Sequence, residues 1–166
     1  SVDVPVVGDA ATVLAQMLEV WRRKKYSADK PALEAWWRQI NLWRQRDCLG
    51  FRQTGDVIRP QHAIRRLCEK TAERECFIST EVGQHQMWAA QYLGFEHPNQ
   101  WMTSGGLGTM GYGFPASIGV QIAHPDALVI NVAGEASWLM NMQEMGTAVQ
   151  YRTPVKQFIL NNERLG

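Results

Sequence analysis

The sequence lacks three features that mark specialised classes of protein. No apolar run approaches the roughly 18 residues that a membrane-spanning helix needs, and the N-terminus has no signal-peptide layout. Neither sign of charge dominates, because 17 Lys and Arg residues face 16 Asp and Glu residues. Internal repeats and low-complexity segments are absent as well. These absences predict a globular protein with neither a nucleic acid nor a membrane as partner.

Cysteine is scarce too. The three residues Cys48, Cys68 and Cys76 form no C-x-x-C pair, and the four histidines do not stand at zinc-ligand spacing from them. This pattern predicts reduced thiols in a cytoplasmic protein. By contrast, the seven tryptophans are many for 166 residues, and we expect them to fill core or interface positions.

The pattern of the first third of the chain predicts the end of a domain followed by a linker. Residues 2–7 favour a strand, and Asp9 is placed to cap a helix that runs to about Trp21. After a polar stretch, Pro31 suits the first turn of a second helix with a wide apolar stripe. That stripe, predicted to be a packing surface, consists of Leu33, Trp36, Trp37, Ile40 and Trp43. We expect an irregular connection over residues 47–59.

From Pro60 onward, helical and strand-like patterns alternate. The expected helices cover residues 60–72, 83–92, 108–123 and 142–151, and the expected strands cover residues 76–80, 127–133 and 155–160. Nearly continuous apolar strands between helices predict an α/β fold, a doubly wound parallel sheet covered on both faces. The sequence stops just after the last strand, where such a fold would continue with a helix. We therefore expect a fragment of a longer enzyme.

Polar, turn-forming sequences follow three of the expected strands, at residues 81–85, 134–137 and 161–162. Ligands of open parallel sheets gather at the carboxyl ends of strands, and helix N-termini suit phosphate groups. Glu135 and Asn162 offer oxygen ligands of the kind that magnesium takes. Together these strand ends predict a site for a magnesium-bridged diphosphate.

Individual residues of this set also have plainer interpretations. Ser137 could merely cap the following helix, and Asn161-Asn162 could form an ordinary turn. His85 has no partner at metal-ligand spacing, so a hydrogen bond to phosphate is favoured over a zinc or catalytic role.

One motif points to a different cofactor. Residues 106–111 match the dinucleotide fingerprint G-x-G-x-x-G, and Glu135 ends the next long strand, as that motif requires. The preceding residues 99–104, however, are too polar for the buried first strand of a Rossmann unit. Further glycines at positions 113 and 119 suit close packing of a helix instead. Nicotinamide binding therefore remains the weaker alternative.

Two long segments, residues 82–91 and 104–115, resemble the acetolactate synthase (acetohydroxyacid synthase) family, specifically the bacterial large catalytic subunits. The strand ends at 134–137 and 161–162 resemble the thiamine diphosphate motif of the wider enzyme family. The resemblance spans the whole chain. It implies that residues 1–21 end a central, flavin-associated domain, that 22–59 form a linker with an amphipathic helix, and that 60–166 form a thiamine diphosphate-binding domain, incomplete at its C-terminus.

Position by position, the resemblance implies roles for the residues of the first two motifs. Gly83, Gln84 and His85 would lie at the diphosphate end of thiamine diphosphate. Gly108 and Met110 would contact its aminopyrimidine, with Met110 as the apolar wedge beneath the bent cofactor.

The remaining motif residues would hold phosphate and metal. By resemblance, Ala136 and Ser137 would donate to phosphate, while Glu135, Asn162 and the backbone carbonyl of Arg164 would bind Mg²⁺. The family usually has aspartate where this chain has Glu135, so the longer side chain is a departure from its pattern. Asp9 is expected near the FAD of the full-length parent.

The activity implied for that parent is the condensation of two pyruvate molecules, or of pyruvate with 2-oxobutyrate, with loss of CO₂. This reaction belongs to the biosynthesis of isoleucine, valine and leucine. The resemblance also implies a homodimer or tetramer and a regulatory small subunit. Because the activating glutamate belongs to an N-terminal domain outside these residues, we expect the chain alone to be inactive. The alternative from another class is a non-catalytic module that binds thiamine diphosphate or phosphate.

Overall fold

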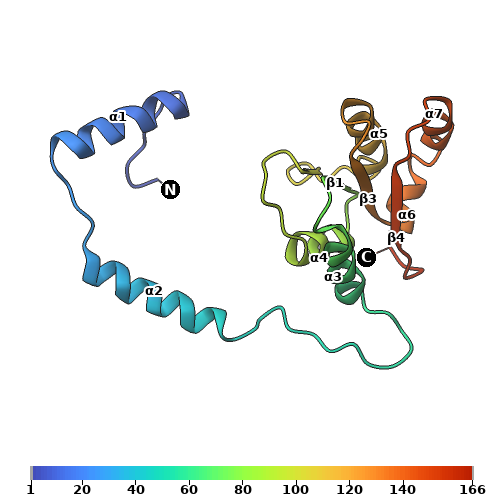
Figure 1. Cartoon of the computed structure of the whole chain (residues 1–166), viewed down its shortest axis with the longest axis horizontal. Coiled ribbons are helices and arrows are strands. Elements are labelled where there is room, and N and C mark those ends of the chain that lie inside the picture. The colour runs from blue at the N-terminus through green and yellow to red at the C-terminus, as the bar shows by residue number, and fades with distance from the viewer. Residues whose placement is uncertain (1, 166) are drawn as a thin grey trace. The chain divides into compact units, whose positions relative to one another are not determined.

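The computed structural model describes residues 2–165 and divides into two units, Ser1–Gly50 and Phe51–Gly166 (Figure 1). Within those described residues, no helix is both long and apolar enough to cross a bilayer.

The first unit consists of two capped helices, α1 (Ala10–Arg23) and α2 (Lys30–Arg44). The Asp9 carboxylate accepts the Thr12 N–H at 2.9 Å, as predicted for the cap of α1, and Asp29 caps α2 in the same way. The strand predicted over residues 2–7 is wrong, because these residues form no β-structure. A strand needs a partner for its N–H and C=O groups, and the described part of this unit contains only helices and connections.

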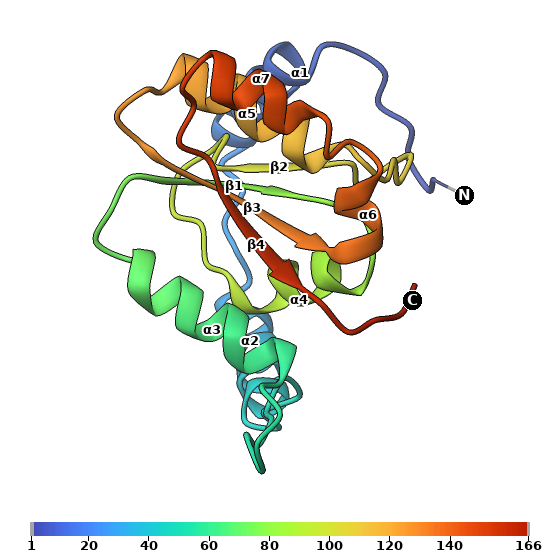
Figure 2. The same cartoon turned by 90° about the vertical axis from the view of Figure 1, so that its right-hand side faces the viewer.

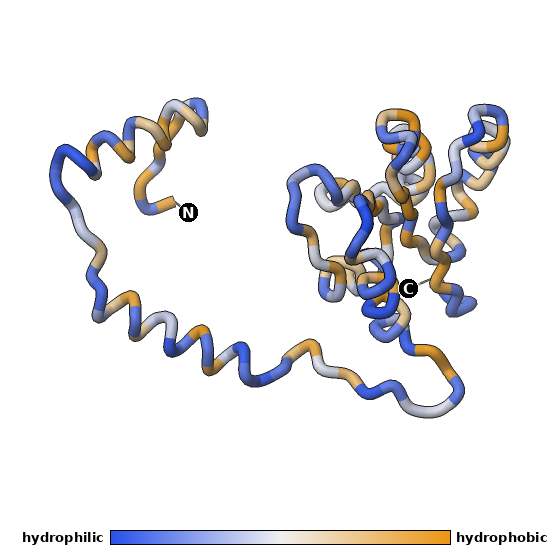
Figure 3. Tube along the Cα trace, in the orientation of Figure 1, coloured by the Kyte–Doolittle hydropathy of each residue, from blue (hydrophilic) through white to orange (hydrophobic). Residues whose placement is uncertain are grey.

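Both helices of this unit expose their apolar residues, which recur along each helix between polar ones (Figure 3). The exposed side chains include Leu14, Met17, Leu18 and Trp21 of α1 and Leu33, Trp36, Trp37 and Trp43 of α2. The stripe expected to be a packing surface is therefore uncovered within its own unit.

The second unit is built around a parallel sheet whose strands stand in the order β2-β1-β3-β4. Its strands are β1 (Cys76–Thr80), β2 (Trp101–Thr103), β3 (Leu128–Gly134) and β4 (Lys156–Leu160). Its helices are α3 (Pro60–Thr71), α4 (Gln84–Tyr92), α5 (Gly113–Ala123), α6 (Glu135–Leu139) and α7 (Glu144–Gln150). Helices α3 and α4 lie on one face, and α5 and α7 on the other (Figure 2). The predicted doubly wound α/β fold is confirmed.

The central strand β3 is buried on both faces, which is why its sequence reads as one apolar run. On the side of α3 and α4, the core consists of Ile64, Ile78, Ala89, Ile130 and Val132. Inside the sheet, the Asn131 side chain accepts a hydrogen bond from the Ser79 hydroxyl at 3.1 Å and donates to the Gln157 Oε1 at 2.8 Å. This chain of polar groups crosses three strands and joins them in one register.

Two helices differ most clearly from the sequence-based expectation. Helix α5 begins at Gly113 rather than near residue 108, because Gly108 and Gly111 have φ angles of 73° and 83°, outside the helical region. The short helix α6 follows β3 directly and was not anticipated, since five residues are too few for an apolar period to show.

Candidate functional site

The carboxyl ends of the parallel strands bring the three predicted segments to one edge of the sheet. Strand β1 leads into Glu81, β3 into Glu135, and β4 into Asn161. Figure 2 shows α6 and the C-terminal segment at the end of the sheet toward which the arrowheads point. This is the edge where ligands of doubly wound sheets bind.

Glu135 and Asn162 meet at a single backbone group. The N–H of Arg164 donates to Glu135 Oε1 at 3.0 Å and to Asn162 Oδ1 at 3.1 Å. Both side-chain oxygens therefore lie within hydrogen-bond reach of the same nitrogen, although the two residues belong to the ends of different strands. The Asn161 side chain accepts the Glu163 N–H at 3.0 Å and shapes the same turn.

The oxygen groups at this turn fit a hard divalent cation. Among residues 2–165, no group of three or more His, Cys, Asp or Glu side chains could hold a metal ion. A metal here would instead use one carboxylate, one carboxamide and a main-chain carbonyl, a mixture of ligands that Mg²⁺ accepts. Glu135 and Asn162 bring two side-chain oxygens to one point of this turn, and the Arg164 carbonyl is the third ligand expected from the resemblance.

The start of α4, next to the end of β3, provides N–H groups without a side-chain cap. Its N-cap residue, Gly83, has a φ of 150°, a conformation that L side chains rarely adopt, and no side chain caps the helix. Free N–H groups at a helix N-terminus suit an anion such as a phosphate. Gln84, the first residue of α4, is exposed.

His85 lies against the end of β3, with its ring next to Gly134. A Cβ atom at position 134 would lie 2.8 Å from His85 Nδ1, so only glycine leaves room for the imidazole. Burial lowers the pKa of His85, while the Glu81 backbone and the Glu135 charge act in the opposite direction. The buried Nε2 atom has no hydrogen-bond partner in the described structure. An orphaned ring nitrogen at this strand end is a group that a polar ligand would satisfy.

Ala136 and Ser137 form the first turn of α6, which also lacks a side-chain cap. The Ser137 hydroxyl is buried and donates to Glu81 Oε2 at 3.0 Å. Its side chain is thus used inside the protein, and its backbone N–H is the group left for an anion.

The loop with Gly108 and Met110 runs from β2 to α5. The Ser104 hydroxyl accepts the Thr109 N–H at 2.9 Å, and Asn141 Nδ2 donates to the Gly111 carbonyl at 2.6 Å. Gly108 is exposed and Met110 is half-buried. Hydrogen bonds on both sides of Met110 therefore hold it in a defined loop.

Glu81 is a member of this site that the sequence did not single out. It is fully buried and accepts hydrogen bonds from the N–H groups of Gly111 and Phe114 at 2.7 and 2.9 Å. Its position directly after a buried strand was visible in the sequence. Its donors, some thirty residues further on, were not.

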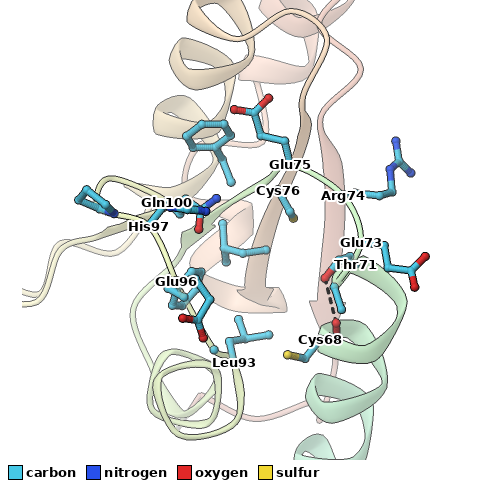
Figure 4. Close-up of a pocket in the computed structure, with 16 residues that line it drawn as sticks. Cys68, Thr71, Glu73, Arg74, Glu75, Cys76, Leu93, Glu96, His97 and Gln100 are labelled. Carbon is cyan, nitrogen blue, oxygen red and sulfur yellow. Dashed lines mark hydrogen bonds between the residues drawn. The ribbon is translucent and has the colours of Figure 1, made fainter.

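Asp9 and one cavity of the second unit take no part in the contacts described above. Asp9, expected near a flavin, belongs to the first unit, and its hydrogen bonds to Thr12 lower the pKa of its carboxyl group. A cavity of about 770 Å³ opens where α3 ends and β1 and β2 begin (Figure 4). Its walls include Thr71, Cys76 and Gln100, at the opposite ends of the strands from Glu135.

Comparison with known families identifies the family of the chain. A family model described as the thiamine pyrophosphate enzyme, C-terminal TPP binding domain, matches residues 81–166. The chain belongs to the thiamine pyrophosphate enzyme family. The matched region includes the glycine loop at 106–111, so the nicotinamide alternative loses its support.

Individual relatives confirm the resemblance to acetolactate synthases. The chain is 44% identical over 164 residues to acetolactate synthase isozyme 3 large subunit of Escherichia coli (strain K12), covering 99% of this chain and 28% of that protein. It is 42% identical to the acetolactate synthase large subunit of Haemophilus influenzae, covering 99% and 28%, and 43% identical to the chloroplastic acetolactate synthase of Arabidopsis thaliana, covering 98% and 24%. The chain thus spans 28% or less of the length of these relatives.

Proposed function

We propose that the chain forms the diphosphate- and metal-binding half of the active site of an acetolactate synthase. The observation that carries this proposal is the convergence of Glu135 and Asn162 on the Arg164 N–H, at the end of the sheet and inside the region that matches thiamine pyrophosphate enzymes. The similarity to acetolactate synthase large subunits supports the choice among reactions of that family.

In this proposal each strand end holds a different part of thiamine diphosphate. Glu135, Asn162 and the Arg164 carbonyl bind Mg²⁺. The diphosphate would be held by the start of α4, with Gly83, Gln84 and His85, and by the first turn of α6, with Ala136 and Ser137. Gly108 and Met110 contact the aminopyrimidine.

Thiamine diphosphate supplies the carbon nucleophile and the electron sink for decarboxylating a 2-oxoacid. The residues of this chain bind and orient it. In the whole protein, pyruvate condenses with a second pyruvate or with 2-oxobutyrate, and CO₂ is lost, in branched-chain amino-acid biosynthesis. The proposal includes FAD near Asp9, a homodimer or tetramer, a regulatory small subunit and a cytoplasmic location. It also includes the division into a central-domain tail (1–21), a linker (22–59) and a cofactor domain (60–166).

The 166-residue chain should bind thiamine diphosphate but should not convert pyruvate to acetolactate. The reason is that the activating glutamate of the family is assigned to an N-terminal domain outside these residues. We expect quenching of tryptophan fluorescence on titration with thiamine diphosphate and Mg²⁺, no quenching with NAD, and no acetolactate from pyruvate. Detection of acetolactate would contradict the assignment of the activating acid to another domain.

Glu135→Ala tests the metal-bound arrangement against a simple phosphate-binding module. Under the proposal this variant loses the Mg²⁺-dependent part of thiamine diphosphate binding. Glu163→Ala is the matched control, because it removes an exposed carboxylate from the same turn. Binding by Glu135→Ala that is unchanged and insensitive to chelation of Mg²⁺ would favour the non-catalytic phosphate-binding alternative.

A further inference from the structure

We propose that Glu81 is a positioning residue for the cofactor's pyrimidine end: it fixes the turn at residues 111–114 and, through it, the backbone of Met110. The inference rests on the proposed function, in which Met110 contacts the aminopyrimidine. It assigns a role to a buried carboxyl group that the cofactor-binding motifs leave without one.

The Glu81 carboxyl group accepts hydrogen bonds from three separate places. Oε2 accepts the Gly111 N–H at 2.7 Å and the Ser137 hydroxyl at 3.0 Å, and Oε1 accepts the Phe114 N–H at 2.9 Å. Gly111 ends the pyrimidine loop, Phe114 lies in the first turn of α5, and Ser137 lies in the helix that begins with Glu135. One side chain thereby connects the loop to the element with the metal ligand.

Glu81 has no basic partner among residues 2–165: the one ion pair in that part of the chain joins Arg66 and Glu69. A carboxyl group in the interior costs free energy unless its oxygens are hydrogen-bonded, and here neutral donors alone satisfy it. An apolar side chain could fill the same volume but could not hold the two N–H groups of the turn. A carboxylate at position 81 is therefore explained by the two N–H groups of the turn that it accepts.

The turn itself is held from two sides. Gly111 donates its N–H to Glu81, and its carbonyl accepts from Asn141 Nδ2 at 2.6 Å. Its φ of 83° is strained for other residues, and a Cβ there would lie 2.8 Å from Asn141 Nδ2. Because Met110 directly precedes this fixed peptide, its backbone cannot move unless a hydrogen bond to Gly111 breaks.

Glu81→Gln tests the proposal with a nearly isosteric change. A carboxamide has one acceptor oxygen, so the N–H of either Gly111 or Phe114 faces an NH₂ group. The turn then loses one of its two backbone hydrogen bonds to residue 81. Glu144→Gln is the matched control, because within residues 2–165 the Glu144 side chain accepts only a hydroxyl hydrogen bond, from Thr147 in its own helix. The measurements are dissociation constants of the 166-residue chain for thiamine diphosphate with Mg²⁺ and for magnesium pyrophosphate, which lacks the pyrimidine.

We expect Glu81→Gln to weaken thiamine diphosphate binding about tenfold and to change pyrophosphate binding by less than about threefold. Met110→Ala should weaken cofactor binding in the parent chain but add little in the Glu81→Gln background, since the side chain is already displaced. Equal losses for both ligands, additive effects of the two substitutions, or no effect of Glu81→Gln would each overturn the proposal.

Hydrogen exchange tests the positioning without any cofactor. In Glu81→Gln, amides of residues 105–112 should exchange faster while those of β3 stay protected; equal acceleration in β3 would mean a general loss of stability and would overturn the proposal.

If the parent chain binds no thiamine diphosphate, the proposed function fails, and with it the cofactor role of Glu81. Should Glu81→Gln not fold, Asn141→Ala releases Gly111 from the other side and is expected to give the same ligand and exchange pattern.

Discussion

Gly113 packs directly on the backbone at the end of β1: a Cβ atom at position 113 would lie 2.6 Å from the backbone nitrogen of Glu81. Helix α5 therefore begins in contact with the strand end that leads into the candidate site. Backbone atoms cannot rotate away as a side chain can, so the contact requires a residue without a side chain.

Gly113→Ala should destabilise the second unit by about 1–3 kcal/mol, the usual cost of overpacking. Gly119→Ala, in the same helix, meets no atom within 4 Å and should instead stabilise it by about 0.5–1 kcal/mol. Urea unfolding of the two variants checks the sign of each effect. A Gly113→Ala variant as stable as the parent chain would contradict the described packing of α5 on β1.

Gly134→Ala should impair cofactor binding more than folding. The new methyl group would meet the His85 ring, which is a side chain and can shift, so the loss of stability should be about 1 kcal/mol. The displaced imidazole would leave the diphosphate end, and thiamine diphosphate affinity should fall about tenfold. Titration of tryptophan fluorescence and thermal unfolding give the two quantities. Gly146→Ala lies inside α7 with open space around it, so as the control it should leave binding unchanged and raise stability by about 0.5–1 kcal/mol.

Asn162→Ala should raise the Mg²⁺ concentration needed for half-maximal cofactor binding by at least about tenfold, because even groups outside the direct ligands change metal affinity by that factor. Asn161→Ala is a close control: its side chain also accepts an N–H two residues on, but it does not share a donor with Glu135. Both asparagines are exposed, so neither change should alter the unfolding free energy by more than about 0.5 kcal/mol. Equal Mg²⁺ requirements in the two variants would argue against Asn162 as a ligand.

Cys76 should make stability fall at alkaline pH. Burial raises the pKa of its thiol above the ordinary value of 9.0, although hydrogen bonding with Thr71 and the charge of Arg74 oppose the shift. The folded state thus holds this proton more tightly than the unfolded chain. The stability from this difference is present below about pH 9 and is lost as pH rises through the raised pKa of the folded state.

Urea unfolding near neutral pH and at about pH 10 tests this sign. The loss of stability between the two should be smaller in Cys76→Ala than in the parent chain, and unchanged in Cys48→Ala, whose thiol is exposed. Identical losses in all three proteins would contradict a role for Cys76.

Much of the second unit could be predicted because its strands and turns are marked by patterns within short stretches of sequence. Apolar runs identified buried strands, and the change from strand to turn at residues 81, 134 and 161 predicted that these segments meet at one edge of the sheet. The strand expected at residues 2–7 failed because β-branched residues favour extended backbone but do not supply a pairing partner. The shared Arg164 donor and the Glu81 contacts could not be predicted, since each depends on backbone groups brought together only by the fold.

The pairing of the strands also bears on when the turn at Arg164 can form during folding. Strand β3 pairs with both β1 and β4, and Glu135 precedes the residues of the turn at 161–164 in the chain. Parallel pairings between distant segments form slowly, and the turn at Arg164 exists only after β4 has joined the sheet. Under the proposed function, Mg²⁺ binds only when β4 is paired with β3, so Mg²⁺ should stabilise the paired strands over forms in which β4 is detached.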